Sequence, residues 1–367
     1  MMSETTAPGS DYRAAFDGVA VSPGVDCHFL MVTGKAPGEM LNGLLSQSPP
    51  PPLRPLGDRS AGGAEAPEAA ARKYGGAAVY STLLTSKGRM ITDLRITSDP
   101  MGGFLLEIPG VGFQGAMAHF RKFLPPRLAS VEDRSPSLAI LTLLGSEAPG
   151  PLASALSGYG LPLSREEVGA LGEGDVLVLA SPDDGIFRVR GNGDALVPGW
   201  DLILPVDSRE AVRSSLVEMG ATPLSEKTLD TLRIEKGRPL FGKDMDEDTI
   251  PLEAGIQSRA IDNQKGCYTG QEVVIRIRDR GHVNKELRGL LLGEAPEATF
   301  HQELFDPKKE RSVGWVTSSV VSPHFGQTVA LGYLQRTVKP GDTVRLGDAE
   351  GPAALVVALS DQGWILD

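Results

Sequence analysis

The sequence predicts an α+β fold made of two mostly antiparallel modules and a C-terminal small β-barrel. Three observations lead to this class. Short strand-like runs separated by glycine and proline turns fill much of residues 24–206, and helical stretches interrupt them in each half. Residues 289–367 contain strand-like runs alone. A chain of 367 residues is long enough for two or three domains.

The first module is predicted to span residues 1–136. It opens with a strand, a glycine turn and a short helix within residues 24–47. Residues 49–75 then break all periodicity with four consecutive prolines and an Ala/Gly/Glu-rich composition, so we interpret them as an exposed, disordered insertion. The module continues with strands at 77–85, 89–97 and 103–110 and a helix at 113–125.

The second module is predicted to span residues 137–245 and to repeat this scheme. Its helices begin at Pro149, Ser208 and Ser225, and two of them end at a glycine turn that leads into a new segment. Residues 246–288 carry the densest functional chemistry, and we expect this cysteine-motif segment to pack back at a central opening of the molecule. The barrel follows in residues 289–367.

Composition and charge restrict the function classes. A formal net charge of −11 argues against general nucleic-acid or membrane binding. No apolar run reaches the roughly 18 residues of a membrane-spanning helix, and the N-terminus lacks signal-peptide and transit-peptide features, so we expect a cytoplasmic location. Cys27 and Cys267 are too few for a disulfide framework or a closed metal site, and no resident metal is expected.

One motif, KGCYTGQEVVIRIRDRG at residues 265–281, combines a thiol with positive charge. Cys267 stands between Gly266 and Gly270 in a predicted tight turn, and Lys265 nearby favours the thiolate. We therefore predict that Cys267 and Lys265 form a reactive site. The alternative is a small buried hydrophobic cysteine, and redox, covalent and cluster-handling roles all stay open.

The second half of the motif predicts a strand. Apolar residues and arginines alternate over residues 273–280, so one face would enter a core. The guanidiniums of Arg276, Arg278 and Arg280 would then project together, about 7 Å apart. Arginine forks match carboxylate and phosphate geometry, so this face predicts anion binding. The alternative is a solvated outer face paired with nearby carboxylates.

The octapeptide KGCYTGQE, with the arginines and glycine that follow it, resembles the signature of YgfZ-type folate-binding proteins. They are a branch of the glycine cleavage T-protein (aminomethyltransferase) superfamily that assists the maturation of 4Fe–4S enzymes. Residues 84–94, 232–255 and 313–334 are similar to other segments of the superfamily. By this resemblance the motif residues are Lys265, Gly266, Cys267, Tyr268, Gly270, Gln271, Glu272, Arg276, Arg280 and Gly281.

The resemblance implies a ring-like, three-part molecule with non-covalent tetrahydrofolate in a central opening beside the cysteine loop. Asp93 would contact the pterin, and Asp201 is the nearest acidic match to a second family position. Arg276 and Arg278 would meet the anionic tail. The chain departs from the transferases at Thr92, where they have a first acid before Asp93, and this departure argues against classical glycine cleavage.

The function implied is that of a folate-binding accessory protein for maturation or repair of 4Fe–4S enzymes. It would not be a conventional enzyme. Its partners would be iron–sulfur client enzymes or cluster carriers, and any effect on tRNA modification would be indirect. One alternative is a folate-dependent aminomethyl or methyl transferase. Another is direct RNA binding through the arginine face, although the net charge makes nucleic acid an unfavourable partner.

Overall fold

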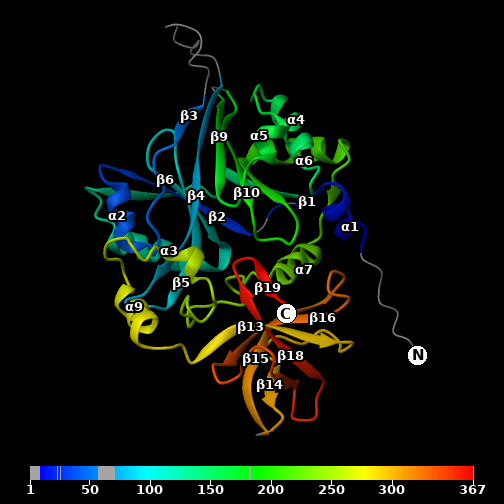
Figure 1. Ribbon diagram of the computed structural model, residues 1–367. Coiled ribbons are helices and arrows are strands. Elements are labelled where there is room, and N and C mark those ends of the chain that lie inside the picture. Colours follow the sequence, from blue (N-terminus) through cyan, green and yellow to red (C-terminus); the bar gives the residue numbers. More distant parts are fainter. Residues whose placement is uncertain are drawn as a thin grey trace.

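A computed structural model describes residues 9–22, 24, 26–56, 71–181, 183–308 and 310–366. It consists of one long, strongly curved sheet with helices packed on it, a β-barrel beneath, and a connecting segment between them (Figure 1). The long sheet has 12 strands and the barrel sheet has 7. This arrangement confirms the predicted α+β class and its C-terminal barrel. None of the helices in the described ranges is both long and apolar enough to cross a membrane.

The first module is the half of the long sheet formed by β4, β5, β6, β2 and β7. Helix α3 covers one face, because Phe113 and Phe120 share a buried cluster with Leu94 and Leu106 of the strands. The elements of this module are β2 (Cys27–Gly34), α2 (Pro37–Leu44), β3 (Arg54–Leu56), β4 (Arg72–Leu84), β5 (Met90–Ser98), β6 (Phe104–Pro109), α3 (Gly110–Phe123) and β7 (Ala129–Asp133).

The predicted insertion at residues 49–75 is ordered at both ends. Strand β3 pairs with β4 in the register Arg54↔Gly75 to Leu56↔Lys73, so the prediction of disorder is wrong for these residues. The prolines of residues 49–52 do not prevent this, since Pro50 and Pro51 offer their carbonyl oxygens to the Ser98 hydroxyl. Residues 57–70 lie outside the described part of the chain.

The second module is the other half of the sheet, with α4, α5 and α6 packed on it. It also takes in the N-terminal elements, because β1 pairs with β8 and β12, whereas the sequence had placed residues 10–22 in the first module. Its elements are α1 (Ser10–Asp17), β1 (Ala20–Ser22), β8 (Leu138–Leu144), α4 (Pro149–Ser157), α5 (Arg165–Gly169), β9 (Asp175–Ser181), β10 (Gly185–Asn192), β11 (Gly199–Pro205), η1 (Val206–Ser208), α6 (Arg209–Glu218), β12 (Thr222–Pro223) and α7 (Glu226–Lys236).

Strand β4 pairs with strands of both modules. The first half of β4 pairs with β9, from Arg72↔Ala180 to Ala77↔Asp175, and its second half pairs with β5, from Ala78↔Thr97 onward. Backbone hydrogen bonds therefore run from one module into the other. The sheets predicted for the two modules are therefore a single continuous sheet.

The barrel closes on itself. Its order is β13-β16-β15-β14-β17-β18, and β18 pairs back with β13, so no strand of this ring has an open edge. Leu290, Val316, Leu334 and Val356 fill its interior. Its strands are β13 (Lys285–Gly293), β14 (Glu303–Asp306), β15 (Arg311–Ser322), β16 (Gln327–Gln335), β17 (Thr343–Leu346) and β18 (Ala353–Ser360), and β19 (Gly363–Ile365) extends it.

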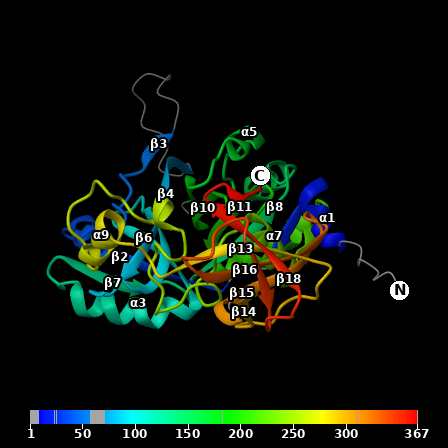
Figure 2. The ribbon, with the colours of Figure 1, turned by 60° about the horizontal axis from the view of Figure 1, so that its bottom comes forward.

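The connector, residues 237–284, runs between the modules and the barrel (Figure 2). It contains two helices, α8 (Gln257–Ala260) and α9 (Gln271–Arg280). Phe241, Met245 and Tyr268 of the connector share a buried cluster with Leu84 and Met90 of the first module. The connector thus packs against the first module, and this contact positions the groups described next.

Candidate functional site

The motif segment forms a helix after Gly270, so the predicted strand is wrong. Gly270 has φ +85°, a left-handed conformation that turns the chain into α9. Val274, and Ile277 three residues on, are apolar at helical spacing, and in so short a window this pattern competes with period-2 alternation. Tertiary packing decides, because Val274 is buried against the first module.

The three arginines consequently do not share one face. Arg276 and Arg280 are one helical turn apart, while Arg278 points elsewhere and hydrogen-bonds Asn263 and Asp279. All three are exposed. The predicted anion-binding stripe of guanidiniums is absent, and with it the main support for direct RNA binding.

Two segments that the sequence singled out meet at Gly270. A Cβ at this position would lie 2.6 Å from the Thr85 carbonyl oxygen, and one at Gly88 would lie 3.0 Å from the Val273 Cβ. The turn that follows β4 therefore packs directly on the start of α9. This contact fixes where the cysteine loop stands relative to strand β5.

Replacing Gly270 with alanine is expected to destabilise the fold by about 1–3 kcal/mol, because the left-handed backbone and the Thr85 carbonyl both oppose a side chain. Urea denaturation followed by circular dichroism measures the change. Gly266→Ala is the control, since a Cβ there meets no atom within 4 Å. Equal stability of the two variants would show that the contact does not constrain the loop.

Lys265 anchors the loop rather than serving as a free cation. Its ammonium donates to three carbonyl oxygens at the end of α2: Asn42 at 2.8 Å, Leu45 at 2.7 Å and Gln47 at 3.0 Å. These bonds use all three of its donors. Burial lowers the pKa of Lys265 to about 8. We therefore assign Lys265 a positioning role, in place of the predicted direct one.

Cys267 is exposed on this anchored loop. Tyr268 beside it is buried at 7 % exposure, while Gly266 on the other side faces open space. Gln271 is half-buried and Glu272 exposed at the start of α9. The loop thus presents one thiol to solvent from a fixed base. The thiol of Cys27 is less accessible, and burial raises its pKa.

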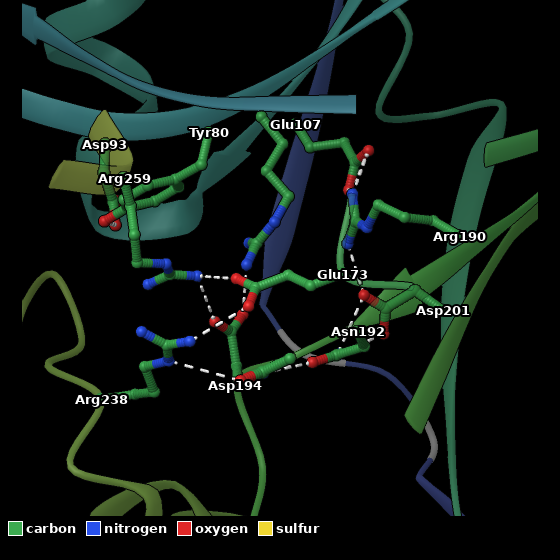
Figure 3. Close-up of polar contacts among 12 residues, drawn as sticks. Tyr80, Asp93, Glu107, Glu173, Arg190, Asn192, Asp194, Asp201, Arg238 and Arg259 are labelled. Atoms are coloured by element: carbon green, nitrogen blue, oxygen red, sulfur yellow. Dashed lines mark hydrogen bonds and ion pairs between the residues drawn. The ribbon is translucent and has the colours of Figure 1, made fainter. Parts of the chain in front are cut away.

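Five charged residues from the two modules and the connector form a central charge cluster (Figure 3). Arg259 bonds Glu173 and also Asp194, the latter at 3.1 Å. Arg238 lies 3.1 Å from Glu173, and Arg95 pairs with Asp194. Although burial acts to raise it, Arg95 and Arg259 hold the pKa of Asp194 well below its ordinary value. The cluster ties strand β5, the ends of β9 and β10, and the connector to one point.

Asp93 lies next to this cluster with one oxygen unused. Its Oδ2 accepts a 2.8 Å bond from the Tyr80 hydroxyl (Figure 3). The guanidiniums of Arg95 and Arg259 lie over the Tyr80 ring at 5.4 and 4.8 Å. Asp93 is 8 % exposed, and its Oδ1 has no partner among the described residues. Burial raises the pKa of Asp93, against the lowering effect of Tyr80.

Thr92, the departure from the transferases, points away from this site. Adjacent residues of a strand face opposite sides, and Thr92 is buried against Gly112 of α3 with its hydroxyl on the Asp93 carbonyl at 2.8 Å. A carboxylate at residue 92 would therefore not stand beside Asp93. Having threonine at residue 92 thus removes no acid from the face that carries Asp93. From the sequence, this threonine was an argument against transfer chemistry, and its position in the fold does not support that argument.

Asp201 belongs to a second, buried cluster. Its Oδ1 accepts from Thr142 at 2.7 Å, and its Oδ2 pairs with Arg190, which also bonds Glu107 at 2.5 and 2.6 Å. Asn192 donates to both Asp201 oxygens, and its own Oδ1 accepts from the Asp194 backbone (Figure 3). With both oxygens engaged, Asp201 supports the position of Asp194 rather than presenting a free acceptor.

A pocket of about 340 Å³ opens beside the central charge cluster, between the connector and the barrel. Arg238 and Arg259 line it and belong to the cluster as well. Arg288 of β13 lines it with a buried Nε that has no partner among the described residues. Within the same described ranges, no group of three or more His, Cys, Asp or Glu side chains is arranged to hold a metal ion.

Sequence reasoning missed most of this cluster. Arg95 could have been identified from the sequence, because it lies two residues after Asp93 and so faces the same side of the strand. Tyr80 pairs with Arg95 across β4 and β5, which required the hairpin register. The remaining residues, Glu173, Asp194, Arg238 and Arg259, come from separate loops or short helices, and no sequence spacing connects them.

Comparison with known proteins agrees with this architecture of a two-module sheet, a connector and a barrel around a polar centre. Residues 67–265 match the GCVT N-terminal domain family, and residues 285–359 match the glycine cleavage T-protein C-terminal barrel domain family. The chain therefore belongs to the glycine cleavage T-protein family.

Named relatives support this assignment. The chain is 30% identical over 281 residues to an aminomethyltransferase of Rubrobacter xylanophilus, covering 77% of this chain and 72% of that one. It is also 30% identical over 261 residues to one from Thermosynechococcus vestitus, covering 71% and 67%. The crystal structure of glycine cleavage system aminomethyltransferase T from Bartonella henselae shares the fold, with a TM-score of 0.76 over 97% of this chain and 90% of that one, at 20% identity.

Proposed function

We propose that this protein binds tetrahydrofolate beside Asp93 and the central charge cluster and transfers a one-carbon group on it. The observation that carries the proposal is the Asp93 carboxyl group. One of its oxygens is buried with no partner among the described residues, and buried polar atoms nearly always have one, so the site fits a ligand that supplies hydrogen bonds. The named aminomethyltransferase relatives support this reading over a purely accessory role.

The residues present fit the chemistry of a folate. Its pterin head carries amide-like donors that Asp93 can accept. Its anionic tail would compete with Glu173 and Glu286, the carboxylates that pair with Arg238, Arg259 and Arg288 around the pocket. Tetrahydrofolate would supply the nitrogens that take up the one-carbon unit. Tyr80 orients Asp93 through its hydroxyl, and burial raises the pKa of Asp93, which suits a carboxyl group that holds or moves a proton.

The direct test is a turnover assay. The protein is incubated with tetrahydrofolate and an aminomethyl donor, and methylenetetrahydrofolate and the released ammonia are measured over time. Formation of several product molecules per protein molecule supports transfer. Saturable tetrahydrofolate binding in calorimetry without any product supports a binding role alone, and absence of both rejects the proposal.

A second candidate function rests on the exposed Cys267. An accessory protein of 4Fe–4S enzyme maturation needs an accessible thiol on a fixed base, and the Lys265 anchor provides such a base. Because a cluster usually takes four thiolates, a client enzyme or a cluster carrier would supply the other ligands. The YgfZ-type resemblance of the octapeptide points the same way.

For this candidate, we expect Cys267→Ala to abolish support of a 4Fe–4S client enzyme in cells while folding and tetrahydrofolate affinity stay unchanged. The exposed side chain makes no packing contribution to lose, so stability is preserved. Client activity in a strain lacking the native protein is the measurement, with Cys27→Ala as the control. Full client activity of the Cys267 variant would remove the thiol from the mechanism.

A further inference from the structure

A second cavity, of about 300 Å³, lies where the barrel meets residues 242–249 of the connector. We call it the barrel pocket. It shares no lining residue with the pocket beside the central charge cluster. Strands β13, β15 and β16 of the barrel supply one wall. Nothing in the proposed folate chemistry uses it.

Two aromatic rings of this wall converge on a positive charge. The rings of Trp315 and Tyr333 are 5.7 Å apart, and the Lys285 ammonium lies 4.9 Å from one centroid and 4.8 Å from the other. Ring faces attract cations, and the attraction grows where water is excluded. The chain's own side chain thus marks a position that is favourable for an ammonium group.

Lys285 is not locked in this position. Its nearest carboxylate, that of Glu253, is 3.8 Å away, which is longer than a hydrogen bond, and its side chain is 26% exposed. An incoming cation can therefore take the place above the rings while Lys285 moves to a direct bond with Glu253. This exchange keeps every charge paired.

The Tyr333 hydroxyl also lines this pocket. Tyr333 is 3 % exposed, and its oxygen makes no hydrogen bond of normal length to any described residue, although the Thr249 hydroxyl lies close enough to act on the pKa of Tyr333. A buried hydroxyl of this kind is rare in folded proteins, because leaving it unpaired is costly. It indicates a partner that comes from outside the chain.

Asp246, which also lines the pocket, forms no ion pair within the described residues. Asp244 is committed to Arg233 at 2.7 Å, and Asp248 pairs with Arg89. Within the described ranges, Asp246 accepts only from the Asp248 backbone at 2.9 Å and from the Thr249 hydroxyl at 2.8 Å.

The second lysine of the lining, Lys243, is already paired with a carboxylate. It lies 3.2 Å from Asp230 outside the pocket. Among the described residues, the Asp246 carboxylate at the mouth of the barrel pocket therefore has no ion-pair partner.

A strained residue closes one side. His301 has φ +61°, which is unfavourable for a residue with a side chain, and its ring stacks on Phe300 at 4.0 Å and lies edge-on to Trp315 at 6.2 Å. Phe300 is 62% exposed. The strained turn holds the exposed Phe300 ring at the rim of the barrel pocket.

We propose that the barrel pocket binds an organic cation with N–H donors, that is, a primary ammonium or a guanidinium group. The rings of Trp315 and Tyr333 accommodate the charge, the Tyr333 oxygen accepts one N–H, and Asp246 balances the charge at the mouth. Two sources share this chemistry: a free aliphatic amine, and a lysine or arginine side chain of a partner protein.

The test uses the full-length protein and defined probes. Nα-acetyl-lysine amide and Nα-acetyl-arginine amide represent side chains, putrescine represents free amines, choline is a cation without N–H donors on nitrogen, and glutarate is an anion. Calorimetry and tryptophan fluorescence follow binding. We expect saturation by the amines and guanidines with a Kd on the order of 1 mM or tighter, roughly tenfold weaker binding of choline, and none of glutarate.

The probes also separate the two sources. Putrescine binding more tightly than the capped amino acids indicates a free amine, and the reverse order indicates a protein side chain. Either order supports the site. Absence of saturation for every cation overturns the proposal, and so does glutarate binding as tightly as the amines.

Two variants test the assigned contacts. Tyr333→Phe is expected to weaken ammonium binding about tenfold while leaving the unliganded protein as stable as the wild type or more so, because the lost hydroxyl made no hydrogen bond of normal length to a described residue. Asp246→Asn is expected to weaken binding by a similar factor, on the order of tenfold. Asp348→Asn is the matched control, since Asp348 is also an exposed barrel-side turn carboxylate that accepts a backbone N–H at 2.9 Å. Unchanged binding in both pocket variants contradicts the assignment.

Discussion

Replacing Arg190 with methionine is expected to destabilise the protein by about 3–5 kcal/mol. Arg190 bonds both oxygens of Glu107 in the first module and pairs with Asp201 in the second. The three side chains are 3, 6 and 4% exposed, so neither carboxylate can turn to water when the guanidinium is removed. The cost comes from two buried negative charges left without their cation.

Chemical denaturation followed by circular dichroism measures this loss. Arg213→Met is the control, because Arg213 forms an exposed pair with Glu210 at 2.8 Å and such pairs contribute about 0–1 kcal/mol. A double variant, Arg190→Met with Glu107→Met, is expected to recover part of the loss, since one orphaned charge is removed with it. If the single variant behaved like the Arg213 control, the buried cluster would not couple the modules.

The link between the two modules shows why only part of the fold could be predicted from the sequence. The individual strands follow local alternation, and the barrel follows from a run of short strands with turns, so both were accessible from sequence. The pairing of β4 with β9 was not. It depends on a strand of 13 residues that changes partner halfway, and alternation is the same whichever neighbour a strand has.

The motif helix shows a second limit. Residues 273–280 alternate apolar and charged side chains, which satisfies the period of a strand, yet Gly270 starts a helix and the Val274 side chain is buried. A stretch of ten residues leaves both periods open. The contact of Gly270 with the turn at Thr85, far away in sequence, decides between them.

The residues of the candidate site also differ in whether the sequence alone could identify them. Cys267 and Asp93 were identified because each lies in a recognisable segment. The central charge cluster was not, since its members Glu173, Asp194 and Arg259 are isolated charged residues that acquire a role only when three chain segments meet. Lys265 was identified for the wrong chemistry, because backbone carbonyls, which any residue supplies, turned out to be its partners.

Asp93 connects the proposed chemistry to a measurable property of the free protein. Burial raises its folded-state pKa above the ordinary value of 3.8, so between these two values the folded protein holds a proton that the unfolded chain has released. Wild-type stability should therefore fall as pH rises through this window, relative to Asp93→Asn, which cannot titrate. Urea denaturation of both proteins from about pH 4 to pH 8 measures the difference. Parallel curves would contradict the raised pKa.

The same position should control the ligand. We expect Asp93→Ala to weaken tetrahydrofolate binding about 10–100-fold, because the buried oxygen that accepts the ligand's hydrogen bond is lost. Asp93→Asn retains one acceptor oxygen, so it should bind within about tenfold of wild type. It should nevertheless lose turnover, since an amide cannot hold or release the proton. Calorimetry and the product assay separate these two effects.

Asp279→Asn serves as the control, because Asp279 is exposed on α9 and bonds only its neighbour Arg278 among the described residues. If the alanine variant binds tetrahydrofolate like this control, the unpartnered oxygen of Asp93 is not a ligand contact. If the asparagine variant turns over at the wild-type rate, Asp93 acts by shape and hydrogen bonding alone. The second result would leave the folate site in place and move the proton transfer to another group.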